Sequence, residues 1–211
     1  MKMTIRICAV LLLFVMCAFA FVSCADKCED DGDGNGGSTL DYSDIDVAAY
    51  VTLGEYKGIE IRLDSADAQK GAAVWNTVVE NAEITDYPEG PLKYYISQAE
   101  KRYKHYAVEG DMEYSEVLES LGITQKDIED DAKKLVKEDL VQLAIIKAEG
   151  IEITEDEKAK FLDKYVEKYV TNYGYSEDYV RKNLIEEIYK SMIYDKMIEY
   201  LVLKNTFITE E

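Results

Sequence analysis

The sequence is poor in the side chains that carry most enzyme chemistry. It contains one histidine, His105, which has no cysteine or second histidine nearby to complete a metal site. It also lacks a nucleophile motif and a glycine-rich phosphate-binding loop. These absences predict a protein that is not an enzyme and that needs no metal or cofactor.

Basic residues are scarce as well. The chain has 24 Lys and Arg residues against 43 Asp and Glu residues, and its formal net charge is −19. Phosphate backbones and anionic lipid headgroups repel so acidic a chain. The composition therefore argues against nucleic-acid binding, and any membrane attachment must come from a lipid. Acidic runs at 129–131 and 186–187 are read as solvated helix faces.

Proline is almost absent, and both prolines, Pro88 and Pro91, lie in the first half of the chain. Periodic apolar runs follow, and glycines stand at their edges, at Gly110, Gly122, Gly150 and Gly174. Thr154 with Glu157, and Thr124 with Asp127, have the spacing of helix-capping boxes. The pattern predicts an all-α fold with helices at about 65–83, 89–108, 114–121, 124–149, 154–173 and 176–204.

The last of these runs, 176–204, is the longest and decides the expected architecture. No proline or glycine interrupts it, so we expect one helix roughly 40 Å long. A single helix cannot cover its own wide apolar face. The preceding helices must therefore pack along it, as an extended multi-helix module with arms.

The N-terminal part of the chain reads differently. Residues 1–23 combine Lys2 and Arg6 with a short apolar run, which is typical of a secretory signal. Residues 24–46 are acidic and glycine-rich and indicate a solvated tether. Residues 47–63 alternate β-forming residues with glycines and predict a short extended segment against the helices, while 64–211 form the helical domain.

Residues 21–24 (FVSC) end the apolar run and resemble a bacterial lipobox, in which the cysteine receives a lipid before cleavage. Cys24 is therefore the predicted lipidation site, although Phe21 replaces the usual leucine. An uncleaved anchor or an ordinary secretory signal cut nearby is the alternative. Processing would make the formal charge more negative, from −19 to −21, through loss of Lys2 and Arg6.

Processing also decides the fate of the cysteines. Cys8 and Cys17 would leave with the signal and Cys24 would be acylated, so that Cys28 alone remains and no disulfide within the chain is possible. The run 31–36 (DGDGNG) imitates the first half of a calcium-binding loop. Because Tyr42 stands where that loop needs a glutamate, a calcium site is not expected.

Several junctions resemble bacterial trigger factor. Residues 53–61 (LGEYKGIEI) are similar to the segment that leads into its prolyl-isomerase domain. Residues 74–84 (VWNTVVENAEI), 148–155 (AEGIEITE) and 205–210 (NTFITE) resemble its C-terminal chaperone domain. Between about 61 and 69 the family carries a whole FKBP-type isomerase domain, and this chain has a few residues there. The ribosome-binding N-terminal domain is also missing.

The resemblance implies a membrane-tethered, extracytoplasmic form of the chaperone part alone, which would bind unfolded or partly folded exported proteins without ATP. A helical surface lipoprotein that acts as a binding or adhesion module is the alternative, because fold alone does not fix function. A prolyl isomerase is the poorer third option. The 17 tyrosines are mostly expected in the core and between helices, with a minority lining a groove for clients.

Overall fold

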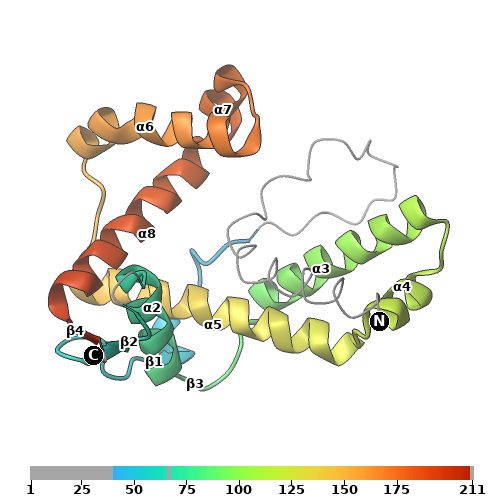
Figure 1. Cartoon of the computed structure of the whole chain (residues 1–211), viewed down its shortest axis with the longest axis horizontal. Coiled ribbons are helices and arrows are strands. Elements are labelled where there is room, and N and C mark those ends of the chain that lie inside the picture. Colours follow the sequence, from blue (N-terminus) through green and yellow to red (C-terminus); the bar gives the residue numbers. More distant parts are fainter. Residues whose placement is uncertain (1–39, 66–67, 210–211) are drawn as a thin grey trace.

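The computed structural model of the chain describes residues 40–65 and 68–209, and most of them are helical (Figure 1). The predicted all-α class is confirmed. A short 3-10 helix, η2 (Val47–Ala49), precedes the α-helices. Within the described ranges these are α2 (Lys70–Asn81), α3 (Glu89–Gly110), α4 (Tyr114–Leu121), α5 (Gln125–Glu149), α6 (Glu155–Tyr173), α7 (Glu177–Asn183) and α8 (Ile185–Lys204).

Two small sheets join segments that are far apart in the sequence. Strand β1 (Val51–Thr52) pairs in antiparallel fashion with β3 (Glu83–Ile84). Strand β2 (Glu60–Leu63) pairs in parallel with β4 (Thr206–Thr209), and Ile61 is opposite Phe207. Both β1 and β2 lie in the segment that sequence patterning marked as extended. Their partner strands were not predicted, because two to four residues carry too little pattern to reveal a strand.

Most helix ends lie where the sequence placed them. The hydroxyls of Thr124 and Thr154 accept hydrogen bonds from the amides of Asp127 and Glu157, so both predicted capping boxes form. Three glycines adopt left-handed backbone angles directly after a helix: Gly122, Gly150 and Gly174. Such angles strain residues with a Cβ, which explains glycine at these ends.

The helix predicted at 65–83 is shorter at both ends. It begins at Lys70, and its last residue, Asn81, is followed by Ala82 in an extended conformation (φ −79°, ψ 140°). Pairing of Glu83 and Ile84 in β3 therefore ends the helix early. The helix predicted at 89–108 continues to Gly110, and it is Asp111 that takes the left-handed position (φ 49°).

The prediction of one continuous helix at 176–204 was wrong. The run divides into α7 and α8 at Leu184, which has φ −118° and ψ 17°. The amide of Leu184 still donates to the Val180 carbonyl at 2.9 Å, and that of Ile188 donates to the Leu184 carbonyl at 3.0 Å. The interruption is therefore a local bend with hydrogen bonds on both sides, and α8 itself is about 30 Å long.

Packing against α6 gives the physical reason for this bend. Val180, Leu184 and Ile188 are buried in one cluster with Val166 and Tyr169 of α6. The guanidinium of Arg181 also bridges α7 to α6, with 2.6 Å from Nη2 to the carboxylate of Asp163. These contacts come from another helix, so the periodicity of the run alone could not reveal the break.

Three separate hydrophobic clusters divide the molecule into a head and two arms (Figure 1). The head contains α2, both sheets and the C-terminal halves of α5 and α8, around Val74, Leu140 and Leu201. The first arm contains α3, α4 and the start of α5, around Tyr103 and Ile128. The second arm consists of α6, α7 and the start of α8. Figure 1 shows the two arms leaving the head in different directions.

A carboxylate at the end of α5 holds the head together. Glu149 accepts hydrogen bonds from Tyr56 at 2.6 Å and from Lys57 at 2.7 Å, and its other oxygen accepts one from Tyr200 of α8. Hydrogen bonds from Lys57, Tyr200 and Tyr56 lower the pKa of Glu149 to about 2. The loop before β2, α5 and α8 are thus joined at one point.

Replacing Glu149 by Gln is expected to change the pH dependence of stability. The folded-state pKa lies below the ordinary value of 4.5, so the unfolded state takes up the proton first as pH falls. The contribution of Glu149 is therefore complete above about pH 4.5 and is lost as pH falls through the folded pKa near 2. Chemical unfolding should show that Glu149→Gln lowers the free energy of unfolding at pH 7 and makes its decline below pH 4.5 shallower.

Glu129→Gln is the matched control. Glu129 lies on the same helix and pairs with Lys133 at 2.6 Å, but its side chain is 48% exposed. Exposed pairs of this kind contribute little, so the control should resemble the parent at every pH. If the free energy of unfolding of Glu149→Gln falls as steeply below pH 4.5 as that of the parent, the stabilising role of ionised Glu149 is wrong.

Candidate functional site

Large apolar side chains are exposed at the far end of the first arm. Val108 is 81% exposed, Leu121 47%, Tyr106 46% and Met112 41%. They come from the end of α3, the turn after it and the end of α4. Together these four residues are called the tip patch. Because α3 and α4 pack on each other around Tyr103 and Val117, these exposed side chains make the end of this arm a candidate contact surface for another molecule.

The far end of the second arm is rich in tyrosine. Tyr169 and Tyr173 lie edge to face, with ring centroids 5.5 Å apart, and Tyr175 stacks on Tyr179 at 5.2 Å. The Tyr173 and Tyr175 rings, 6.4 Å apart, connect the two pairs. Tyr169 is buried, whereas Tyr173 is exposed. Such rings offer apolar area with a polar end, which suits contact with varied partners.

A second group of tyrosines surrounds one carboxylate between the arms. Oδ2 of Asp139, on α5, accepts hydrogen bonds from the hydroxyls of Tyr42 at 2.8 Å and of Tyr95 at 2.6 Å. Tyr94 lies edge to face with Tyr95, with ring centroids 5.4 Å apart. Burial raises the pKa of Asp139, and the hydrogen bonds from Tyr95 and Tyr42 partly oppose this rise.

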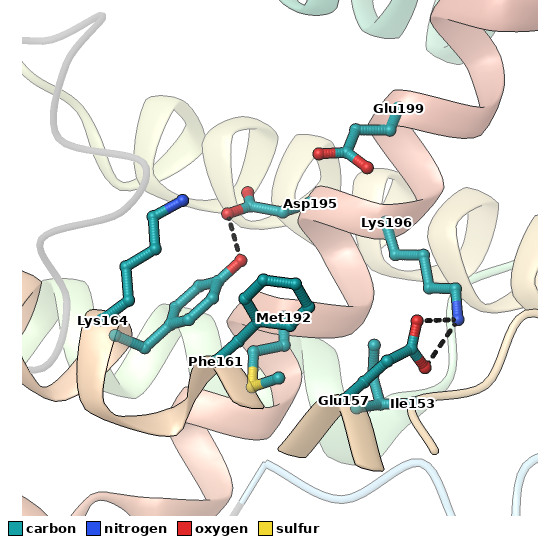
Figure 2. A pocket seen from close by; sticks show the side chains of 9 residues that line it. Ile153, Glu157, Phe161, Lys164, Met192, Asp195, Lys196 and Glu199 are labelled. Atoms are coloured by element: carbon teal, nitrogen blue, oxygen red, sulfur yellow. Dashed lines mark hydrogen bonds and ion pairs between the residues drawn. The ribbon is translucent and has the colours of Figure 1, made fainter. Parts of the chain in front are cut away.

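Two grooves flank α8 where it meets α6. The smaller has a volume of about 120 Å³ and is shown in Figure 2. Phe161 and Met192 form its apolar wall, and Lys196 donates to both oxygens of Glu157, at 2.7 and 2.9 Å (Figure 2). Tyr165 donates to Asp195 at 2.8 Å. Glu157, Lys196 and Asp195 are therefore already bonded within this groove, which fits a structural joint better than a catalytic centre.

The larger groove has a volume of about 450 Å³. Its walls combine apolar groups with charges of both signs, from residues Glu152, Ile153, Lys158, Glu186, Tyr189, Lys190 and Ile193. Its open form offers an adaptable surface rather than a closed ligand pocket.

Several sequence-predicted sites can now be placed. Cys24 and the calcium-like run 31–36 lie outside the described residues. His105 is an exposed residue of α3, and its Nε2 is 3.3 Å from Glu109. Across residues 40–65 and 68–209, no three His, Cys, Asp or Glu side chains are arranged to hold a metal ion.

The acidic run at 129–131 lies on the exposed face of α5. Glu129, Asp130 and Asp131 each pair with a lysine on the same helix, as a solvated face predicts. No helix in the described ranges has the length and apolarity that a membrane span requires.

Sequence analysis missed the carboxylates that organise the tyrosines. Asp139 and Glu149 accept five hydrogen bonds from Tyr and Lys side chains, whose donors come from elements up to 97 residues away. The one hint in the sequence is that the carboxylate of Asp139 stands directly before Leu140, one of the apolar positions of the predicted helix. This hint cannot identify the hydrogen-bond donors, because they come from distant segments that only the tertiary fold brings close.

Comparison with known proteins supports the resemblance read from the junctions. The family model of the bacterial trigger factor protein C-terminus matches residues 60–204. Trigger factor of Clostridioides difficile (strain 630) is 33% identical over 134 residues, which are 59% of this chain and 31% of that protein. Trigger factor of Caldicellulosiruptor saccharolyticus is 25% identical over 180 residues, or 79% of this chain and 40% of that protein.

A third relative, trigger factor of Streptococcus pyogenes serotype M2, is 28% identical over 165 residues, or 75% of this chain and 35% of that protein. The chain thus covers between 31% and 40% of the length of these three proteins. The matched residues contain α2 to α8, and therefore both arms and the helices of the head, whereas β1 and β4 lie outside the match. The chain belongs to the bacterial trigger factor C-terminus family.

Proposed function

We propose that this protein is a chaperone that holds unfolded exported proteins outside the cytoplasm, without ATP, and is attached to the bacterial membrane through a lipid on Cys24. The tip patch carries the proposal: an acidic chain exposes Tyr106, Val108, Met112 and Leu121 on the last turns of α3 and α4 and on the turn between these helices. Membership of the trigger factor C-terminus family favours a chaperone over other uses of such a patch.

The energetics suit transient capture. Covering ~300 Å² of apolar surface at about 25 cal/mol per Å² contributes about 7 kcal/mol before the cost of ordering the client is subtracted. The remainder corresponds to weak, reversible binding of varied segments. The processed chain, with a net charge of −21 after loss of Lys2 and Arg6, keeps loaded complexes apart through mutual repulsion.

Light scattering during thermal aggregation tests the proposal. The purified chain without its first 23 residues should suppress aggregation of two dissimilar client proteins in the absence of ATP. Suppression should persist at moderate salt, because screening weakens exposed charge pairs more than apolar contacts. No suppression at a severalfold molar excess, together with tight binding to one folded ligand, would support the adhesion-module alternative instead.

The same preparation can be tested for isomerase activity. The connection from β2 to α2 is six residues, 64–69, where an FKBP-type domain would need a whole sheet with an aromatic pocket. The family match runs through this connection without a separate isomerase domain. These observations support a non-enzymatic function. Faster cis–trans conversion of a proline peptide, abolished by denaturing the protein, would instead support the isomerase alternative.

Cys24→Ala tests the attachment. The variant is expected to move from the membrane fraction to the soluble or unprocessed pool, because the acidic remainder has no electrostatic attraction to lipid. Fractionation with and without detergent measures the change, and Cys28→Ala is the matched control that should stay with the membrane. Unchanged, detergent-requiring association of a correctly cleaved Cys24→Ala chain would rule out lipid attachment at this residue.

A further inference from the structure

The first described residues pass between the two arms. Residues 40–46, called the strap, precede η2 and lie between α3 and α8, as the blue trace in Figure 1 shows. Tyr42 anchors the strap: its ring packs against the head cluster, and its hydroxyl donates to Asp139 of α5. The strap therefore contacts α5.

Few hydrogen bonds hold the strap. Within the described part of the chain, its backbone bonds are internal or lead into η2: Ile45 N to the Tyr42 carbonyl at 3.1 Å, and Ala49 N to the Asp46 carbonyl at 2.9 Å. The first described backbone bond to a distant segment comes later, where Thr85 N donates to the Tyr50 carbonyl at 2.9 Å. Attachment of the strap thus depends mainly on the side chain of Tyr42.

One described ion pair joins the strap to the helix below it. The strap carries Asp41, Asp44 and Asp46, all exposed. Nζ of Lys147, on α5, is 3.9 Å from Asp46, and the two side chains are 72% and 73% exposed. Exposed pairs of this kind contribute little to stability, so charge adds little to the attachment that Tyr42 provides.

The site that Tyr42 fills selects a particular side chain. Its walls belong to the apolar head cluster, and at its end the Asp139 carboxylate, already bonded to Tyr95, accepts one more hydrogen bond. A phenol ring matches both features. A phenylalanine ring would leave the half-buried carboxylate with one donor fewer, which is unfavourable.

We propose that the Tyr42 site is a binding site for tyrosine side chains of unfolded polypeptides, and that the strap occupies it in cis until a client displaces it. The proposal rests on the chaperone function proposed above and names one subsite for it. If the strap occupies the site in most molecules, the apparent affinity for a client is reduced in proportion to the fraction of molecules in which the site is open. Loosening the strap should therefore strengthen client binding, which is the opposite of what loss of a contact residue produces.

Three variants test this. Tyr42→Phe keeps the ring in the head cluster and removes the hydroxyl, and Tyr42→Ala removes the anchor. Tyr56→Phe is the matched control, because it also deletes a phenol donor to a carboxylate, at Glu149 in the head. Thermal unfolding first establishes that all three fold. The probes are a reduced, alkylated and permanently unfolded polypeptide, and a ten-residue peptide with a single tyrosine together with its phenylalanine twin.

We expect Tyr42→Ala to bind the tyrosine peptide and the unfolded polypeptide at least fivefold more tightly than the parent does. The increase in affinity should be smaller for Tyr42→Phe and absent for Tyr56→Phe. For Tyr42→Ala, the affinity for the phenylalanine twin should increase less than the affinity for the tyrosine peptide. A synthetic peptide of residues 40–50 should compete with the tyrosine peptide for Tyr42→Ala.

The outcomes separate the two proposals. If the parent binds the unfolded polypeptide and both Tyr42 variants stay within twofold of it, the strap proposal is wrong and the chaperone function stands. If only the Tyr42 variants bind, the strap proposal is supported. If neither the parent nor any variant binds, both proposals fail. Equal gains for the tyrosine peptide and its twin would overturn the selectivity for tyrosine.

Discussion

The double substitution Val108→Ser and Leu121→Ser is expected to weaken client binding roughly tenfold, which is about 1.5 kcal/mol if a client covers half of each side chain. In the aggregation assay the variant should need a correspondingly larger molar excess for equal suppression. Both residues are exposed at the end of the first arm. Their loss removes apolar contact area while the buried cluster around Tyr103 and Ile128 stays unchanged.

Leu203→Ser is the matched control. Leu203 is 82% exposed, almost the same as Val108 at 81%, but it lies near the end of α8 in the head, away from both arm tips. It removes an equally exposed apolar side chain at a different place. If Leu203→Ser reduces suppression as much as the double variant does, general surface apolarity and not the tip patch carries the activity.

Local signals explain why most of the helices could be predicted from the sequence. The capping pairs at Thr124 and Thr154, and the glycines that follow α4, α5 and α6, act within a few residues, so each can be read without knowing the fold. The bend at Leu184 and the strand β4 depend on distant partners. The first needs α6 to pack on α7, and the second needs β2 at Glu60–Leu63.

The candidate site shows the same division. Sequence reasoning expected most tyrosines in packing roles, and the tyrosines bonded to Asp139 and the packed rings of the second arm have such roles. The expectation that a minority of tyrosines line a groove for clients stays a prediction. Sequence reasoning could not assign any single binding residue. Tyr42 lies in a segment that the sequence predicts as a solvated tether, because its neighbours are acidic. Its hydrogen-bond acceptor, Asp139, is 97 residues away, so the sequence near Tyr42 does not indicate that this side chain is bound.

Leu140→Ala and Ile188→Ala are expected to destabilise different parts of the molecule. Leu140 is fully buried in the head, and Ile188 is fully buried in the second arm. Each substitution should cost about 2–5 kcal/mol through lost burial and the cavity left behind, out of about 5–15 kcal/mol for a typical domain. Native-state hydrogen exchange can locate each loss.

The arrangement of the clusters predicts the pattern of lost protection. Helices α5 and α8 both pass through the head, so Leu140→Ala should lower protection throughout the described helices. The second arm has its own cluster, so Ile188→Ala should lower protection in α6, α7 and the first half of α8 while α2 and α5 keep theirs. Uniform loss in both variants would show that head and arms unfold as one unit. Selective loss in Ile188→Ala would mean that the second arm can open while the head stays folded, as adaptable capture of differently shaped clients requires.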